Sequence, residues 1–261
     1  MLKLRAKLLQ TVRYFFDDHD YWEVETPLLS HDVAVDLWLE PFITSFEKTP
    51  SSTQNRKPLF LQTSPEFGMK RLLASGAKSI YQITRSFRNG EVGTLHNPEF
   101  TILEWYRVGD NHFDQMCVVE ALVRKVFDVA SHWVAEHADD FIAMQTPFPL
   151  NSKPFRQISY DAAFLQNVGS RVLGLTSVEL KELAIAQKIK PPESLSENLI
   201  HKENLNDCDE WLNLLLAESV EPHLGKEQPE FLYDYPASQA ALAQVRDGNP
   251  PVAERFELYI S

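Results

Sequence analysis

Residues 79–108 contain two runs in which apolar and polar residues alternate, separated by the glycine-containing loop NGEVGTLHN. Alternation with a period of two is typical of β-strands, so the pattern predicts a β-hairpin. One face of this hairpin is expected to carry Gln82, Thr84, Ser86, Arg88, Phe100, Ile102, Glu104 and Tyr106. The register that we expect places Arg88 opposite Phe100. It then places Thr84 opposite Glu104, and Gln82 opposite Tyr106.

Apolar residues spaced three or four apart predict the helices. Helices are expected over 3–19, over 110–136 and, two or three in number, within 159–222. A further helix is expected to open at Ser64-Pro65-Glu66 and to end at Gly76. A serine is a common helix cap, proline is favoured at the first helical position, and an acid is favoured in the first turn.

Short strands account for most of the remaining pattern. They are expected at YWEVETP, VDLWLEPFITSF, LFLQT, FLYDYP and ERFELYIS, with irregular chain at 47–58 and 138–157. Strands that come early and mostly as hairpins, with helices between them, favour an α+β fold with an antiparallel or mixed sheet flanked by helices. We expect a single domain over 1–261, with a helical insertion at about 138–222.

Composition narrows the classes of function. The 261 residues carry a net charge of −12, and the isoelectric point is near 5.1, which argues against a broad nucleic-acid footprint. Two cysteines are too few for a disulfide framework or a cysteine-rich metal site. No apolar run is long enough to span a bilayer, and the basic N-terminal residues lack a signal-peptide pattern, so we expect a cytoplasmic protein.

The polar face of the hairpin has two interpretations. Alternation by itself favours a solvated face. However, ring, hydroxyl and amide groups typically line a binding site, and the loop is longer than a simple turn requires. The second interpretation is recognition of a ligand with a phosphate for Arg88, a ring for Phe100 and a cation for Glu104. Ser64-Pro65-Glu66 is likewise either a helix start or a carboxylate facing a substrate ammonium, and capping by itself explains it.

Three motifs together resemble a known enzyme family. FRN followed by HNPEFTILEWY resembles the second signature motif of class II aminoacyl-tRNA synthetases in their lysyl form. Helix 3–19 with EVETP resembles the first motif, which forms a dimer interface in that family. TSPEFGMKRLL and the segment from EPHLGKEQPEF to VAERFELY are similar to the lysyl-tRNA synthetase paralogues that ligate (R)-β-lysine onto elongation factor P. The resemblance covers essentially the whole chain and implies ATP, Mg²⁺ and a homodimer.

The resemblance also implies roles for individual residues. Arg88 would contact the α-phosphate of ATP as the catalytic group, and Phe100 would stack on adenine. The other nucleotide residues would be Asn89, Gly90, His96 and Asn97, with His96 near the outer phosphates. The amino-acid pocket would be lined by Ser64, Pro65, Glu66 and Tyr106, with Glu104 adjacent. Gly90 stands where the family has a glutamate at the adenine end, and Glu91 is the candidate to replace that glutamate.

Both ends of the chain bear on the expected function. The sequence stops at Ser261, before the acidic strand and third motif of the family, so we expect a fold incomplete at the C-terminus and no metal ligands in this chain. The chain begins at the first-motif helix, which favours a protein-modifying paralogue over an enzyme that acts on tRNA. Three functions stay open: transfer of (R)-β-lysine or lysine to elongation factor P, charging of tRNA, and an inactive paralogue.

Overall fold

The computed structural model describes residues 1–261 except 34–38, 46–56, 95, 138–149, 151–152 and 191–204. Most of the expected loop at 47–58, much of the irregular stretch at 138–157 and part of the strand expected at VDLWLEPFITSF therefore lie outside the described residues. The chain divides into two compact units, Met1–Asp110 and Asn111–Ser261. Each unit is considered by itself.

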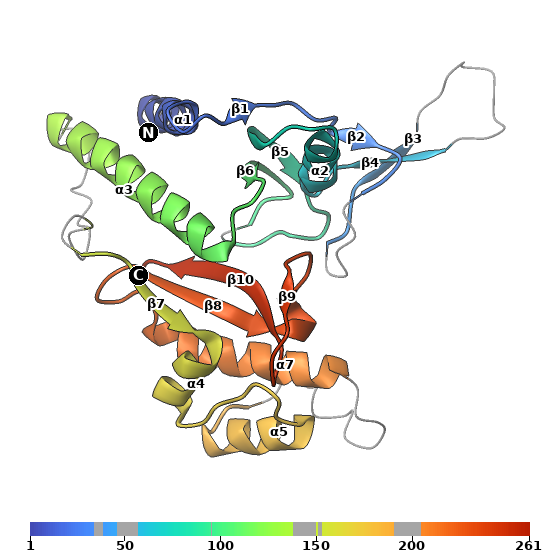
Figure 1. The fold of residues 1–261 in the computed structure, drawn as a ribbon, viewed down its shortest axis with the longest axis vertical. Helices are drawn as coiled ribbons and strands as arrows, with labels where there is room; N and C mark the ends of the chain where they lie inside the picture. Colours follow the sequence, from blue (N-terminus) through green and yellow to red (C-terminus); the bar gives the residue numbers. More distant parts are fainter. Residues whose placement is uncertain (34–38, 46–56, 95, 138–149, 151–152, 191–204) are drawn as a thin grey trace. The chain divides into compact units, whose positions relative to one another are not determined.

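Within the residues that the structure describes, the first unit combines two helices with two small sheets (Figure 1). Its elements are α1 (Leu2–Asp17), β1 (Trp22–Glu23), β2 (Leu29–Ser30), β3 (Ile43–Ser45), β4 (Pro58–Leu61), α2 (Glu66–Ala74), β5 (Ser79–Phe87) and β6 (Glu99–Arg107). One sheet has the order β1-β5-β6 and the other the order β2-β4-β3. The β1–β5 pair is parallel and the remaining pairs are antiparallel, so of the two predicted alternatives, antiparallel or mixed, the hairpin sheet is mixed.

Helix α1 packs its aromatic face on the hairpin sheet. Phe15 and Phe16 are buried, and the ring of Phe16 stacks on Tyr81 of β5 with centroids 4.7 Å apart. Such an aromatic pair contributes about 0.5–1.5 kcal/mol beyond the burial of its surface. The Tyr81 hydroxyl donates to Asp17 and Glu23, so the buried ring keeps its polar end satisfied and holds the end of α1 against β1 and β5.

The hairpin forms where it was predicted, but its register differs from the expected one. Gln82 lies opposite Glu104, and Ser86 lies opposite Phe100. The predicted register was therefore wrong by two residues. The strands end earlier than expected, and the Arg88 amide donates to the carbonyl of Pro98 at 2.9 Å. Because side chains alternate with a period of two, a shift of two residues leaves each one on its predicted face.

Helix α2 packs closely against the segment that follows β1, and the close contact lies at a glycine. A Cβ atom added to Gly68 would lie 2.7 Å from Cβ of Thr26, a distance that packed atoms do not tolerate. Thr26 in turn donates its hydroxyl to Gln82 of β5 at 3.0 Å. The helix ends at Ala74, two residues before the expected Gly76. Gly76 has φ +109°, a backbone conformation that glycine adopts readily after a helix.

The second unit is a four-stranded sheet with helices on both faces (Figure 1). Its elements are α3 (His112–Glu136), β7 (Arg156–Ser159), α4 (Tyr160–Val168), α5 (Ser177–Ala186), α7 (Leu205–Leu215), η2 (Leu216–Val220), η3 (Glu221–His223), β8 (Glu230–Pro236), η4 (Ala237–Gln239), β9 (Val245–Arg246) and β10 (Val252–Tyr259). The strand order is β7-β8-β10-β9, and β7 pairs with β8 in parallel.

Successive side chains of β8 point to opposite faces of the sheet, so the core of this unit consists of two clusters, one on each face. Phe231 packs with Met116 of α3 and with Phe155. Its neighbour Leu232 packs on the other face, in the larger cluster that includes Tyr160 of α4. The helices α4, α5 and α7 account for the helices expected within 159–222. The range predicted as a helical insertion also contains the strand β7, and the single domain with an insertion stays a prediction.

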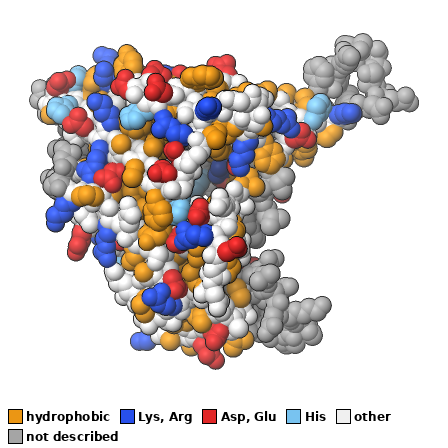
Figure 2. All heavy atoms as spheres, in the orientation of Figure 1, with side chains coloured by type: hydrophobic (Ala, Val, Ile, Leu, Met, Phe, Trp, Pro, Cys, Tyr) orange, Lys and Arg blue, Asp and Glu red, His pale blue; other side chains and the backbone are white. Residues whose placement is uncertain are grey.

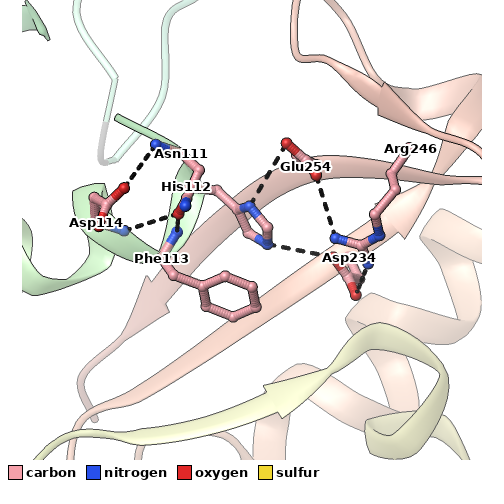
Figure 3. A network of polar contacts seen from close by, with 7 residues as sticks. All are labelled: Asn111, His112, Phe113, Asp114, Asp234, Arg246 and Glu254. Carbon is pink, nitrogen blue, oxygen red and sulfur yellow. Dashed lines mark hydrogen bonds and ion pairs between the residues drawn. The ribbon is translucent and has the colours of Figure 1, made fainter. Parts of the chain in front are cut away.

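A buried polar network ties α3 to three strands of the second unit (Figure 3). His112, 7% exposed, lies 3.4 Å from Asp234 of β8 and 3.9 Å from Glu254 of β10. Arg246 of β9 lies 2.5 Å from Asp234 and 3.3 Å from Glu254. One guanidinium therefore offsets the repulsion between two half-buried carboxylates. The helix starts with a capping box between Asn111 and Asp114, and the amide of Phe113 also donates to the Asn111 side chain.

Candidate active site

Arg88 and Phe100 meet on the polar face of the β5–β6 hairpin. Cζ of Arg88 lies 5.0 Å from the centroid of the Phe100 ring. The Arg88 Nε donates to the carbonyl oxygen of Thr63 at 3.4 Å. Its Nη1 lies 3.7 Å from a carboxylate oxygen of Glu91. We call Arg88 and Phe100 the Arg88 group. The prediction that the guanidinium and the ring share one face is confirmed.

Glu104 is the centre of a second cluster on the same face. It accepts a hydrogen bond of 2.6 Å from the Tyr106 hydroxyl and one of 2.8 Å from the Ser64 hydroxyl. Burial raises the pKa of Glu104, while these two hydrogen bonds act in the opposite direction and the charge of Glu66 adds to the rise. We call Ser64, Glu66, Glu104 and Tyr106 the Glu104 group.

The phenol of Tyr106 is held in its protonated form. Burial raises the pKa of Tyr106 most, and the neighbouring charge of Glu104 and the hydrogen bond to it raise the pKa further. A phenol that stays protonated is a permanent donor to the carboxylate. This arrangement orients Glu104 and leaves the remaining lone pairs of its oxygens for further donors, such as an ammonium group.

The N-terminus of α2 contributes the rest of the Glu104 group. The Ser64 hydroxyl accepts from the amide of Glu66 at 3.0 Å while it donates to Glu104. Pro65, not Ser64, occupies the cap position of α2, without a side-chain cap hydrogen bond, so the predicted serine cap was wrong by one residue. The Ser64 hydroxyl instead binds the amide of the first helical residue and Glu104 at the same time. Pro65 is buried between Ser64 and Glu66. Glu66 pairs with Lys70 at 2.7 Å.

A single turn connects the two groups. The carbonyl of Thr63 holds Arg88, and the next side chain, Ser64, holds Glu104. Phe100 and Glu104 are four residues apart on β6, which corresponds to about 13 Å along a strand. The face is therefore bordered by a cation with an aromatic ring at one end and by carboxylates at the other.

The loop between the strands carries the other predicted nucleotide residues. The side chains of Asn89, His96 and Asn97 are exposed, and the Asn89 amide donates to the carbonyl of Glu40 at 2.7 Å. Gly90 has φ +84°, with no atom within 4 Å of an added Cβ. Space therefore exists for a side chain at this position, but the backbone conformation favours glycine.

Sequence reasoning missed Thr63 and Lys70 beside these groups. Thr63 is fully buried, as is Ser86, which was predicted on this face, and the hydroxyls of both lack a hydrogen-bond partner in the described structure. Lys70 had a weak signal, namely its spacing of four residues from Glu66 on a predicted helix. Thr63 had none, because its contribution to Arg88 is made by the backbone carbonyl.

Two further properties bear on ligands. Among the described residues, no group of three or more His, Cys, Asp or Glu side chains is placed to hold a metal ion, and no helix is long and apolar enough to cross a membrane. On the face drawn in Figure 2, lysine and arginine side chains lie interspersed with acidic and hydrophobic ones.

Comparison with known proteins identifies the family. The family model of class II tRNA synthetases (D, K and N) matches residues 1–261. The chain therefore belongs to the class II tRNA synthetase family, as its signature motifs predicted, and the α+β fold is confirmed with it.

Within that family, the chain is similar to proteins named elongation factor P (R)-β-lysine ligase. The protein of Edwardsiella ictaluri is 40% identical over 255 residues, which are 98% of this chain and 68% of that protein. The protein of Pseudoalteromonas translucida is 40% identical over 258 residues, 99% of this chain and 69% of that protein. The protein of Vibrio cholerae is 40% identical over 261 residues, with the same two shares.

Proposed function

We propose that this chain activates (R)-β-lysine, or lysine, with ATP and transfers it to a lysine side chain of elongation factor P. One observation carries the proposal. The Arg88 group and the Glu104 group lie on the same face of one hairpin and are joined by the turn at Thr63–Ser64. This face offers a cation and a ring to a nucleotide, and carboxylates to a cationic amino acid. The relatives act, by their names, on elongation factor P.

Arg88 and Phe100 are proposed to bind the nucleotide. In the first step, a carboxylate oxygen of the amino acid attacks the α-phosphorus of ATP. The bond from that phosphorus to the bridging oxygen breaks, and pyrophosphate leaves with the electron pair. Negative charge builds on phosphoryl oxygens, and a guanidinium at that place would stabilise it by about 3 kcal/mol. Asn89, Gly90, His96 and Asn97 are proposed to border the same nucleotide.

Glu66 and Glu104 are proposed to bind the ammonium groups of the amino acid, with Ser64, Pro65 and Tyr106 lining the same pocket. Charge-assisted hydrogen bonds between ammonium and carboxylate are short and strong. Tyr106 and Ser64 hold Glu104 in place before the substrate arrives, so little ordering is needed when it binds. In the second step, the ε-amine of the acceptor lysine attacks the acyl carbon and AMP leaves.

Mg²⁺ stays a prediction from the family. Within the part of the chain that the structure describes, no group of three or more His, Cys, Asp or Glu side chains is placed to hold a metal ion. Magnesium commonly takes its ligands from substrate phosphates, water and one or two carboxylates. An ion that arrives with ATP would suit this site, and no step above depends on it.

A homodimer and a cytoplasmic location complete the proposal. Leu2 and Trp22 are large apolar side chains directly beside the segments 3–19 and 23–27 that resemble the first motif, and they are 85% and 68% exposed. Single exposed apolar side chains are common on protein surfaces, so the proposed dimer rests on the resemblance to the first motif of the family. Sedimentation analysis of the full chain and of Trp22→Glu tests it. A monomeric wild-type protein would contradict the proposed dimer.

Pyrophosphate exchange tests the activity. The chain is incubated with ATP, labelled pyrophosphate and either (R)-β-lysine, α-lysine or no amino acid. Exchange that depends on one of the two amino acids supports the proposal, and the preferred one identifies the substrate. Exchange with neither refutes activation. Mass spectrometry of elongation factor P then tests transfer, whereas aminoacylation of tRNA would favour the alternative acceptor.

Binding of ATP, measured by calorimetry, distinguishes an inactive paralogue from an active one. ATP binding that is lost in Arg88→Ala, without exchange in the wild-type chain, would identify a domain that binds nucleotide but does not react.

A further inference from the structure

Lys70 places a lysine ammonium on one carboxylate of the Glu104 group. Its Nζ lies 2.7 Å from Oε1 of Glu66, one helical turn earlier on α2. The Glu66 side chain is only 23% exposed, and that of Lys70 is 42% exposed. The positive charge of Lys70 also lowers the pKa of Glu104, against the larger effect of burial. Lys70 therefore acts on both carboxylates of this group.

The neighbouring residue shows what an ordinary surface ion pair on this helix looks like. Arg71 lies 3.2 Å from Asp32, and the two side chains are 71% and 66% exposed. Exposed pairs of this kind contribute little to stability. Lys70 differs from Arg71 because its partner is partly buried and belongs to the candidate site.

We propose that Lys70 is an internal counter-ion of the amino-acid pocket, which the substrate ammonium displaces from Glu66. This inference rests on the proposed function, in which Glu66 receives a substrate ammonium. The side chain of Lys70 carries the same group on the same four-carbon stem as the side chain of lysine. It satisfies Glu66 in the free protein, and it sets how tightly a cationic amino acid binds.

The charge of the pocket gives the physical reason. With Lys70 present, the two carboxylates and one ammonium leave a single net negative charge for a substrate that carries two ammonium groups. The substrate must compete with Lys70 for Glu66. Since the pair is partly open to water, its displacement has a modest cost. Removal of the Lys70 charge should therefore tighten binding.

Calorimetry on the full chain tests this with matched variants. Lys70→Met keeps the unbranched stem and the helix propensity but removes the charge, and Arg71→Met is the control. The dissociation constants of α-lysine and (R)-β-lysine are measured without ATP. We expect the dissociation constant of the amino acid that binds to fall about two- to fivefold in Lys70→Met and to be unchanged in Arg71→Met. Lys70→Gln serves if the methionine variant fails to fold.

Two analogues identify the ammonium that meets Glu66. Norleucine lacks the ε-ammonium of lysine, and 6-aminohexanoate lacks the α-ammonium. Glu66 receives one of the two ammonium groups. Only the analogue that keeps that group should therefore bind more tightly to Lys70→Met than to the wild-type chain. An equal gain for both would show a general field effect and overturn the proposal.

The remaining outcomes are also decisive. Unchanged affinity in Lys70→Met would make Lys70 an ordinary surface residue, and weaker affinity would make it a support of Glu66 instead of a competitor. Either result overturns this inference and leaves the proposed function intact. A wild-type chain that binds neither amino acid overturns the proposed function itself, and this inference with it.

Discussion

The two ends of the hairpin face are held in different ways. In the Glu104 group, a carboxylate accepts hydrogen bonds of 2.6 and 2.8 Å from two hydroxyls. In the Arg88 group, the guanidinium has a 3.4 Å hydrogen bond to one carbonyl and a carboxylate 3.7 Å away. The Glu104 group is therefore preorganised, whereas the guanidinium of Arg88 is held only weakly in the ligand-free protein. Substitutions in the Glu104 group should cost stability and binding, whereas those in the Arg88 group should cost mainly activity.

The largest effect is expected at Arg88. Arg88→Ala should slow amino-acid-dependent pyrophosphate exchange about a hundredfold, because about 3 kcal/mol of stabilisation of the developing charge is lost. The free energy of unfolding should change by no more than about 0.5 kcal/mol. Arg85→Ala is the control, since Arg85 lies on the opposite face and pairs with Glu99 at 3.6 Å. A large loss of stability in Arg88→Ala would remove the contrast between the two ends.

The next effect is expected at Tyr106. Tyr106→Phe removes the 2.6 Å donor to Glu104 and should lower the free energy of unfolding by about 1–2 kcal/mol. Amino-acid binding should weaken with it, because the carboxylate loses its orientation. Chemical denaturation and calorimetry measure the two quantities. Tyr14→Phe, at a 56% exposed tyrosine, should change neither. Full stability in Tyr106→Phe would mean that the carboxylate is not preorganised.

A smaller effect is expected in the pH dependence of stability. Burial raises the pKa of Glu104 above its ordinary value of 4.5, so the folded state binds more protons than the unfolded state above that pH. The stability from this group is complete below pH 4.5 and is lost as pH rises through the folded-state value. Glu104→Gln should lack this loss. Unfolding measured from about pH 4 to about pH 7 tests it, and parallel curves for the two proteins would contradict it.

The smallest effect is expected at Glu91. In the ligand-free protein this carboxylate lies 3.7 Å from the guanidinium that would meet a phosphate. Glu91→Gln should therefore tighten ATP binding about two- to fivefold, as measured by calorimetry. Glu99→Gln removes the same charge from the opposite face of the hairpin and should have less effect. Weaker binding in Glu91→Gln would instead support Glu91 as the replacement for the glutamate that Gly90 lacks.

Much of the candidate site was predictable because it lies on two neighbouring strands. Arg88, Phe100, Glu104 and Tyr106 were assigned to one face by a period of two, and the face is correct although the register was not. The position of Lys70 beside the site was harder to predict. Its spacing from Glu66 suggests a helix pair, but only the fold places that pair beside Glu104.

The polar network of the second unit marks the limit of such reasoning. His112, Asp234, Arg246 and Glu254 come from four elements spread over more than half of the chain. No local spacing relates a residue at the start of α3 to the strands β8, β9 and β10. The network depends on how those strands pair, including the irregularity between Ala253 and Phe256 of β10.

The sequence by itself determined the family, the hairpin and the face on which each of its side chains lies, because motif spacing and strand alternation are local properties of the chain. The tertiary structure decided the register of the strands, the hydrogen bond from Ser64 to Glu104, and the position of Lys70 beside Glu104. These features depend on distances between residues that are far apart in sequence or meet across a loop, and such distances are set only when the chain has packed.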